Sequence, residues 1–514
     1  MSELLIAARQ RVLVAPGLSR AVVVASGPLL CATGSLLCGR LVARGQVSST
    51  VVGCTVALVG LAVVASWNPG VAAGLLVLVV MNGLPGIDLG SYLLPGGLRL
   101  SDAAVLLLLG ALFVRVHARG VPRGSWAHRF MVLGLVLGAW WLIVLLRTSF
   151  FEGVPPMRAF LVGRDFLYFA ILLPLLTLGL SGRRELFGCL CTFFGGALLF
   201  SFGEIGISAA GASSSGLAGW FAHASASADE SQGFTRVYAM MGDAVAPIIA
   251  FGLGLALMPP KKRFSRTAGI VLFIVGSIAM LYSLTRALYL GAAFALLVTV
   301  IVWLLGGGSR NAARRAIALF CTGLLVIVVI ISYRSLTSPV SGAASMRVSS
   351  VVTDLRQRNG TVEYRYQLDQ KMLDVLGSRW IAGLGFLHPE SHPVTGLPDG
   401  SIRNTDVGVM NSVMTMGVVG TALLYFAPVA ILLAILRRWR ALTDRDRARN
   451  VEWFFFGATM WLVLVLVTSI TLVTLFSVSG LAMSAMVLAC TAGFMEETGQ
   501  DRASAVPRLD RRRS

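Results

Sequence analysis

The chain has 514 residues, of which 56% are hydrophobic and only 13% are charged. A soluble domain carries about 25% charged residues, so this chain lacks the polar surface that a soluble protein of its length needs. The formal net charge of +19 could indicate nucleic-acid binding, but the basic residues lie mainly beside apolar blocks, where they would face anionic lipid headgroups. We therefore expect an all-α, polytopic membrane helix bundle with no nucleic-acid partner.

Apolar blocks of about 18–22 residues recur along the chain, which is the length that crosses ~30 Å of hydrocarbon. They predict twelve to fourteen transmembrane helices, because the blocks at 69–84 and 101–116 are short. In chain order the predicted spans are 20–40, 49–66, 69–84, 101–116, 129–147, 161–180, 185–207, 237–257, 266–283, 285–305, 314–332, 409–436, 452–471 and 477–494.

Charge predicts the orientation of these spans. With the N-terminus in the cytoplasm, most of the 43 Lys and Arg residues fall in short cytoplasmic segments, as the distribution of basic residues in membrane proteins requires. Both termini are then cytoplasmic. We divide the chain into a transmembrane bundle (1–332), a large extracytoplasmic loop (333–408), three further transmembrane helices (409–494) and a disordered basic tail (495–514).

Two predicted outer segments are too long to be simple connections. The segment 208–236 is rich in Ser, Ala and Gly, and we expect it to be flexible. In the large loop, Tyr364–Trp380 has apolar residues at near-helical spacing, which predicts an amphipathic helix on the outer surface. These residues are Tyr366, Met372, Leu373, Leu376 and Trp380. A glycine-rich stretch, Gly383-Leu384-Gly385-Phe386, follows, and then a polar stretch to residue 408. We expect the function to lie in this loop.

Ionisable side chains within spans usually face a cavity or a partner. Arg286, at an outer helix junction, either reaches the lipid headgroups or binds an anion. Arg164 and Asp165 either neutralise each other or serve a site, and Asp243 is either a proton or cation site or a hydrogen bonder between helices. The seven cysteines all lie in apolar blocks, so we expect neither a disulfide framework nor a metal site.

Four short motifs carry a resemblance to a known family. They are Leu98-Arg99-Leu100-Ser101-Asp102-Ala103; Leu284-Thr285-Arg286-Ala287; Arg365 followed by Gly383-Leu384-Gly385-Phe386; and Asp406 ahead of Gly417-Val418-Val419-Gly420. Over most of its length the chain resembles the O-antigen ligase and polymerase superfamily, whose members transfer glycans from undecaprenyl-pyrophosphate carriers. Asp406-Val407 stands where the ligases have His-Asn, and in this the chain is more similar to the polysaccharide polymerases.

The resemblance implies a metal-independent, inverting glycosyltransferase without a cofactor in the bacterial cytoplasmic membrane. Its partners would be an undecaprenyl-pyrophosphate-linked glycan donor and a glycan or lipid-glycan acceptor. Arg286, Arg365 and Arg164 would hold the pyrophosphate, and Asp406 would act as general base. The residues that could bind the acceptor are His388, His392 and Arg403.

Three other functions are compatible with this pattern. The main one is a flippase for lipid-linked oligosaccharides or another transporter, although transporter sites lie near the bilayer midplane and the charges here gather toward the outer face. A polyprenyl-phosphate-sugar transferase would need acidic residues in its first outer loop, and residues 43–48 contain none. A non-enzymatic scaffold is the third.

Overall fold

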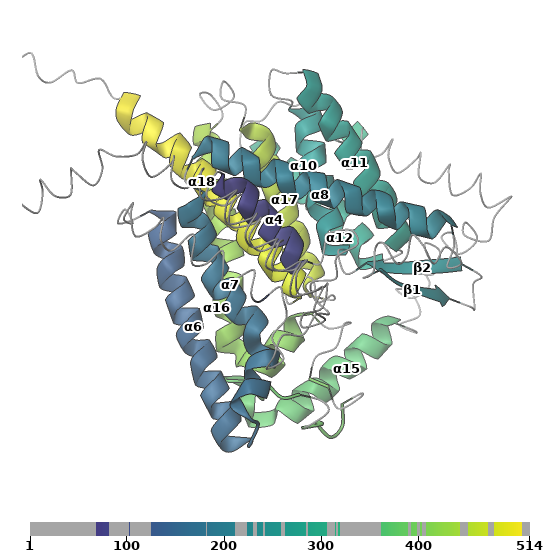
Figure 1. Ribbon diagram of the computed structural model, residues 1–514, viewed down its shortest axis with the longest axis vertical. Coiled ribbons are helices and arrows are strands. Elements are labelled where there is room, and N and C mark those ends of the chain that lie inside the picture. The colour runs from purple at the N-terminus through teal and green to yellow at the C-terminus, as the bar shows by residue number, and fades with distance from the viewer. Residues whose placement is uncertain are drawn as a thin grey trace, which may run out of the picture. The chain divides into compact units, whose positions relative to one another are not determined.

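The computed structural model describes residues 68–81, 102, 125–180, 182–210, 224–229, 234–239, 242–258, 263–283, 286–305, 314, 317–318, 361–388, 392–397, 401–402, 408–442, 451–470 and 477–505. The chain forms two compact units, Met1–Asn68 and Pro69–Ser514, and every element described here belongs to the second. The elements of Figure 1 are α4 (Pro69–Val80), α6 (Trp126–Phe151), α7 (Pro156–Gly179), α8 (Arg183–Ala210), β1 (Ala224–Asp229), β2 (Phe234–Ala239), α10 (Gly242–Leu257), α11 (Arg263–Ser283), α12 (Arg286–Leu305), α15 (Thr361–Leu376), the 3-10 turn η1 (Gly377–Trp380), α16 (Gly408–Leu442), α17 (Glu452–Thr468) and α18 (Val478–Ala505).

These helices confirm a polytopic helical membrane protein. Within the described residues, five helices are long and apolar enough to cross a bilayer, namely α6, α7, α8, α12 and α16. Shorter apolar helices form in α4, α10, α11 and α17. Apart from a few single residues, the predicted spans 20–40, 49–66, 101–116 and 314–332 lie outside the described residues.

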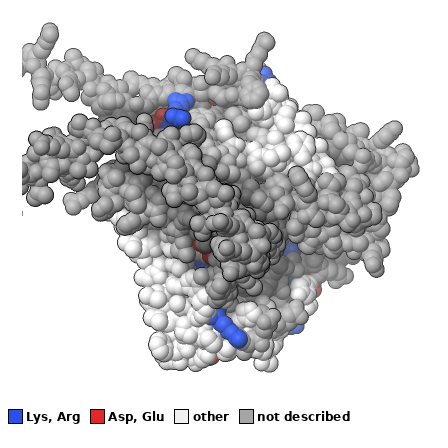
Figure 2. All heavy atoms as spheres, in the orientation of Figure 1, with Lys and Arg blue, Asp and Glu red and all other residues white. Residues whose placement is uncertain are grey.

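The outward faces of the long helices are apolar. On α6, Leu135 is 68% exposed, and α12 and α16 likewise expose Leu297 and Phe426. Figure 2 shows few charged side chains on the described part of the visible face. A large exposed apolar surface marks a membrane or protein contact, and exposed apolar residues on several long helices fit contact with lipid.

The centre of the second unit is built by α17 and α18. Helix α17 is apolar around its whole circumference, as a helix surrounded by others must be, and packs against α10, α12, α16 and α18. The ring of its Phe454 lies between Phe251 of α10 and Phe494 of α18. Every residue of α18 from Gly480 to Met495 is buried.

The two ends of this bundle separate the segments that were predicted on opposite sides of the membrane. At one end, the Trp126 N–H of α6 donates a 2.5 Å hydrogen bond to the Glu496 carboxylate of α18, and the sequence assigns both to the cytoplasm. At the other end, the last turn of α6 contacts the large loop through Arg379 and Phe386. The pairing of the ends agrees with the predicted topology, and the side of the membrane on which each end lies stays a prediction.

Three segments differ from the sequence-based prediction. The segment 208–236 was expected to be flexible, but α8 continues to Ala210 and an antiparallel hairpin follows, with Ala224 opposite Ala239 and Asp229 opposite Phe234. The β2 sequence Phe-Thr-Arg-Val-Tyr-Ala favours a strand because aromatic and β-branched residues suit one, so α10 begins at Gly242 rather than at residue 237. Helix α18 runs on to Ala505, past the predicted start of the tail at residue 495.

The predicted amphipathic helix of the loop forms as α15 and η1, but with a different buried face. Leu368, Met372 and Leu376 are buried at helical spacing, one turn apart. Tyr366, Leu373 and Trp380, which we assigned to the same apolar face, are about half exposed. The heptad spacing of these three residues puts them on a separate stripe, which turns away from the bundle.

Candidate functional site

The glycine turn of the large loop, residues 381–386, is inserted into a break in α16. Helical geometry fails inside α16 at Gly417, where φ is 69° and ψ is −179°, a conformation that is accessible essentially only to glycine. A side chain at Gly417 would bring its Cβ within 2.6 Å of the Ala382 nitrogen and closer still to the Ile381 carbonyl. Two of the motifs quoted from the sequence, one on each side of this contact, therefore meet in space.

Hydrogen bonds join the turn to the broken helix. The Leu384 N–H donates to the Met414 carbonyl at 2.6 Å, and the Val419 N–H donates to the Ile381 carbonyl at 3.5 Å. Trp140 of α6 donates its indole N–H to the Met416 carbonyl at 2.9 Å. Backbone groups that a break would leave unpaired in a bilayer are costly, so these bonds allow a non-helical segment to lie within the bundle.

Phe386 anchors the turn on the other side. Its ring is fully buried beside the rings of Trp141 and Phe166, with centroids 6.0 and 6.4 Å away. Its N–H donates a 3.1 Å hydrogen bond to the Thr148 hydroxyl of α6, and a Cβ at Gly163 of α7 would come within 2.7 Å of the ring. The turn is thereby fixed to α6, α7 and α16 together.

A charged pair lies where α6 ends and η1 begins. Arg379 donates through Nη1 to Glu152 Oε1 at 2.9 Å, with side chains 52% and 25% exposed. Both residues line an open cleft, which His392 also borders. Neither Arg379 nor Glu152 was among the predicted site residues. The sequence did contain a signal for this pair, because Glu152 follows a predicted span and Arg379 lies at the end of the predicted amphipathic segment.

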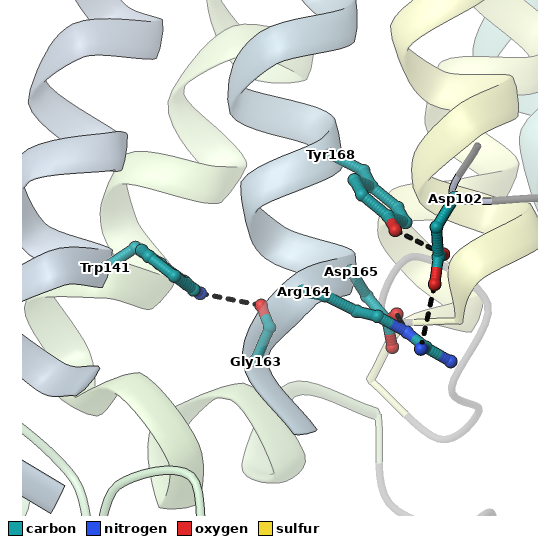
Figure 3. Close-up of polar contacts among 6 residues, drawn as sticks. All are labelled: Asp102, Trp141, Gly163, Arg164, Asp165 and Tyr168. Atoms are coloured by element: carbon teal, nitrogen blue, oxygen red, sulfur yellow. Dashed lines mark hydrogen bonds and ion pairs between the residues drawn. The ribbon is translucent and has the colours of Figure 1, made fainter. Parts of the chain in front are cut away.

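Arg164 belongs to a buried polar cluster on α7 (Figure 3). Its Nη1 lies 3.1 Å from Asp102 Oδ2, and its Nε lies 3.8 Å from Asp165 Oδ1. Tyr168 donates its hydroxyl to the second oxygen of Asp102. The predicted neutralisation of Arg164 by Asp165 is thus supplemented by a shorter contact with Asp102. Among the described residues, the Arg164 guanidinium contacts both carboxylates.

Arg365 lies on α15 one turn before Asp369, and its side chain is half-buried. Burial raises the pKa of the Asp369 carboxyl, and the nearby Arg365 guanidinium partly opposes that shift. The Arg365 charge lies in the N-terminal part of the loop helix α15.

Arg286 is the first residue of α12. Further along that helix, a Cβ at Gly291 would come within 2.6 Å of the Thr468 methyl at the end of α17. The Val409 N–H at the start of α16 donates to the carbonyl of the adjoining Ser469 at 2.8 Å. The starts of α12 and α16 therefore share one end of the bundle.

The other predicted site residues lie in or next to the loop. Asp406 and Arg403 lie outside the described residues, but Asp406 shortly precedes Gly408, where α16 begins. His388 and His392 are half-buried, and the His392 N–H donates to the His388 carbonyl at 2.8 Å. Among the described residues, no group of three or more His, Cys, Asp or Glu side chains is arranged to hold a metal ion.

Comparison with known proteins identifies the segment that contains most of these features. Residues 270–425 match the protein family described as O-antigen ligase, whereas no curated protein matches the chain. The matched segment includes Arg286, Arg365 and both glycine motifs, but leaves out Asp102 and Arg164, so it is narrower than the resemblance we predicted. Over residues 270–425 the chain is thus similar to O-antigen ligases, and this match supports the predicted resemblance to the O-antigen ligase and polymerase superfamily in that segment.

Proposed function

We propose that the chain is a glycosyltransferase of the bacterial cytoplasmic membrane that moves a glycan from an undecaprenyl-pyrophosphate carrier onto an acceptor hydroxyl at the outer face. The observation that carries this proposal is the insertion of the 381–386 turn into the Gly417 break. Both sides of that contact lie in the matched segment. The insertion holds the loop helix α15 against α16, at the bundle end where α12 begins.

The guanidinium groups of Arg286 and Arg365 suit a diphosphate. Guanidinium stays charged at any physiological pH and engages phosphate oxygens bidentately. In the proposed reaction these groups stabilise the charge that develops on the lipid pyrophosphate as it leaves. Arg164 would contribute only if a pyrophosphate displaced it from Asp102 and Asp165, so we assign it a secondary role.

The chemistry is a single displacement. The acceptor hydroxyl oxygen forms a bond to the anomeric carbon while the bond from that carbon to the pyrophosphate oxygen breaks. The bonding electrons stay on the lipid pyrophosphate, and the hydroxyl proton passes to the Asp406 carboxylate as general base. Attack from the face opposite the leaving group inverts the anomeric configuration, and no metal or cofactor takes part in this scheme.

The test is transfer by the purified chain in liposomes that contain lipid-pyrophosphate-linked repeat units. Arg286→Ala and Arg365→Ala are each expected to lower the transfer rate by about 10²-fold or more, as loss of one charge-stabilising group does. Arg129→Ala is the control, because Arg129 is exposed near the opposite end of α6. Wild-type rates in both test variants would refute the assignment. Chain growth would indicate a polymerase, and transfer to a second acceptor would indicate a ligase.

A flippase for the same lipid-linked glycan is the second candidate. The break in α16 and the buried Arg164 cluster favour it, because transporters place broken helices and charges inside the bilayer. Against it, the Met414 and Met416 carbonyls and the Val419 N–H at the break already form hydrogen bonds with the loop and with Trp140. A transported substrate would have to displace these bonds before it could bind the same groups. Movement of lipid-linked glycan across the liposome membrane without joining would establish this second function.

A further inference from the structure

An open cleft of ≈ 490 Å³ lies between the end of α6, η1 and the glycine turn. This volume falls in the range of ~300–1,000 Å³ that is typical of small-molecule sites. One wall is apolar and the rim is polar. The lining residues are Glu152, Val375, Leu376, Gly377, Ser378, Arg379, Leu384, Leu387, His392, Pro393 and Val394.

The walls of the cleft are held by the same contacts that hold the glycine turn. Gly383 donates its N–H to the Arg379 carbonyl at 2.8 Å, which ties the charged rim to the turn. On α6, Thr148 accepts from Phe386 one turn before Glu152. A ligand in the cleft would therefore contact the framework of the proposed transfer site without entering the α16 break.

The chemistry of the lining matches a saccharide. A sugar ring has hydroxyls that both donate and accept, and faces of C–H groups that pack on apolar surface. Arg379 supplies donors, Glu152 supplies acceptors, and the Ser378 hydroxyl supplies both, while Leu384 and Leu387 form an apolar wall. Because the pair is partly exposed, it contributes little to stability, and both of its residues line the cleft.

We propose that this cleft binds sugar units of the glycan acceptor that lie some distance from the reacting hydroxyl, with Arg379 and Glu152 as the groups that recognise their hydroxyls. The proposal rests on the proposed function. Leu376, which lines the cleft, is about three turns beyond Arg365 on α15, or ~16 Å along the helix axis. If the donor pyrophosphate binds at Arg365, the cleft is therefore positioned to contact acceptor sugars that are distant from the new glycosidic bond. Such contacts strengthen ground state and transition state equally, and so lower KM without raising kcat.

The first measurement is direct binding of a free oligosaccharide, released by mild acid from the lipid-linked repeat unit of the producing cells, to the full-length protein in detergent by calorimetry. Glu152→Gln and Arg379→Ala are each expected to weaken binding about tenfold or more, as loss of a hydrogen bond to a charged group does. Glu363→Gln and Arg129→Ala are the controls, since the Glu363 carboxylate accepts a hydrogen bond from Gln367 one turn away on α15 and Arg129 lies at the other end of α6. Unchanged binding in both cleft variants overturns the proposal.

A charge-swapped double variant separates recognition from structure. Glu152→Arg with Arg379→Glu restores an ion pair but exchanges its donors and acceptors. We expect wild-type thermal stability with the saccharide affinity still lost. Recovery of affinity in the swap would make the pair structural and overturn the proposal, as would inorganic pyrophosphate binding in the cleft in place of the sugar.

Kinetics distinguish failure of this proposal from failure of the proposed function. If the chain transfers glycan, Arg379→Ala should raise KM about tenfold for long acceptors and leave kcat, and the KM of single-unit acceptors, unchanged. Normal KM for long acceptors would refute the cleft and leave the transferase intact. Saccharide binding that depends on Arg379 in a chain that transfers nothing would refute the transferase and leave the cleft as a glycan site.

Discussion

Replacement of Gly417 by alanine tests the contact between the two glycine motifs. Its φ of 69° with ψ of −179° costs a residue with a Cβ about 1–3 kcal/mol. The new Cβ would also lie 2.6 Å from the Ala382 nitrogen, inside the 3.0 Å that real Cβ atoms essentially never cross. Overpacking of this kind costs about 1–3 kcal/mol more. We therefore expect Gly417→Ala to destabilise the protein by about 2–6 kcal/mol and to expel the turn.

Two other glycines separate these contributions. Gly377 has φ of 49° but nothing within 4 Å of a built Cβ, so Gly377→Ala carries backbone strain alone. Gly138 lies inside α6 and also has nothing within 4 Å, so Gly138→Ala should be neutral or stabilise by about 0.5–1 kcal/mol.

The assay is equilibrium unfolding in mixed detergent micelles, with limited proteolysis of the loop as a second readout. The expected order of destabilisation is Gly417→Ala, then Gly377→Ala, then Gly138→Ala. If Gly417→Ala were as stable as Gly377→Ala and its loop no more sensitive to protease, the turn would not occupy the break, and our account of the site would be wrong.

Three further predictions concern other contacts. Arg164→Ala should destabilise the protein by about 3–5 kcal/mol, because it removes the guanidinium that is paired with the buried Asp102 carboxylate. The same unfolding assay checks this, and an Arg164→Ala variant that unfolds like wild type would contradict it. Trp140→Phe should lower the free energy of unfolding by about 1–3 kcal/mol, because it removes the indole N–H that donates to the Met416 carbonyl. An unchanged free energy of unfolding would show that this hydrogen bond is dispensable. Asp369 has a folded-state pKa raised above its ordinary 3.8 by burial, so its contribution to stability is complete below that value and is lost as pH rises through the raised pKa. The protection of α15 amides from hydrogen exchange, relative to their intrinsic exchange rate at each pH, should therefore fall across that window in wild type and not in Asp369→Asn. Identical protection profiles in the two proteins would refute the assignment.

The membrane architecture was predictable because its signal is local. Apolar blocks of spanning length and flanking arginines are read directly from the sequence, and each predicted span that falls in the described residues has its helix. The hairpin 224–239 was not predicted. Its surroundings are rich in Ser and Ala, which suggested a flexible segment, and the strand-forming residues of Phe234–Ala239 make only a short run. The face of α15 was misassigned because Tyr366 and Met372 are both apolar in type, and only the bundle decides which of them is buried.

The site was predictable as a set of motifs but not as an arrangement. From the sequence, Gly417 looks like an ordinary glycine inside an apolar helix. Nothing near it in the sequence predicts that α16 breaks there or that residues 381–386 occupy the break. The partners Asp102 and Arg164, like Glu152 and Arg379, lie far apart along the chain, so their pairing arises only from tertiary packing. The motif arginines could be singled out as candidates because charge is rare in this chain. The cleft could not be predicted, because its residues carry no sequence pattern.

The most direct test of the account is the product of a single turnover with lipid-pyrophosphate-linked repeat units. We expect a new glycosidic bond of inverted anomeric configuration, measured by proton NMR, together with one free lipid pyrophosphate per bond, measured by phosphorus NMR. A retained configuration, or lipid-linked glycan that crosses the membrane and is never joined, would contradict it.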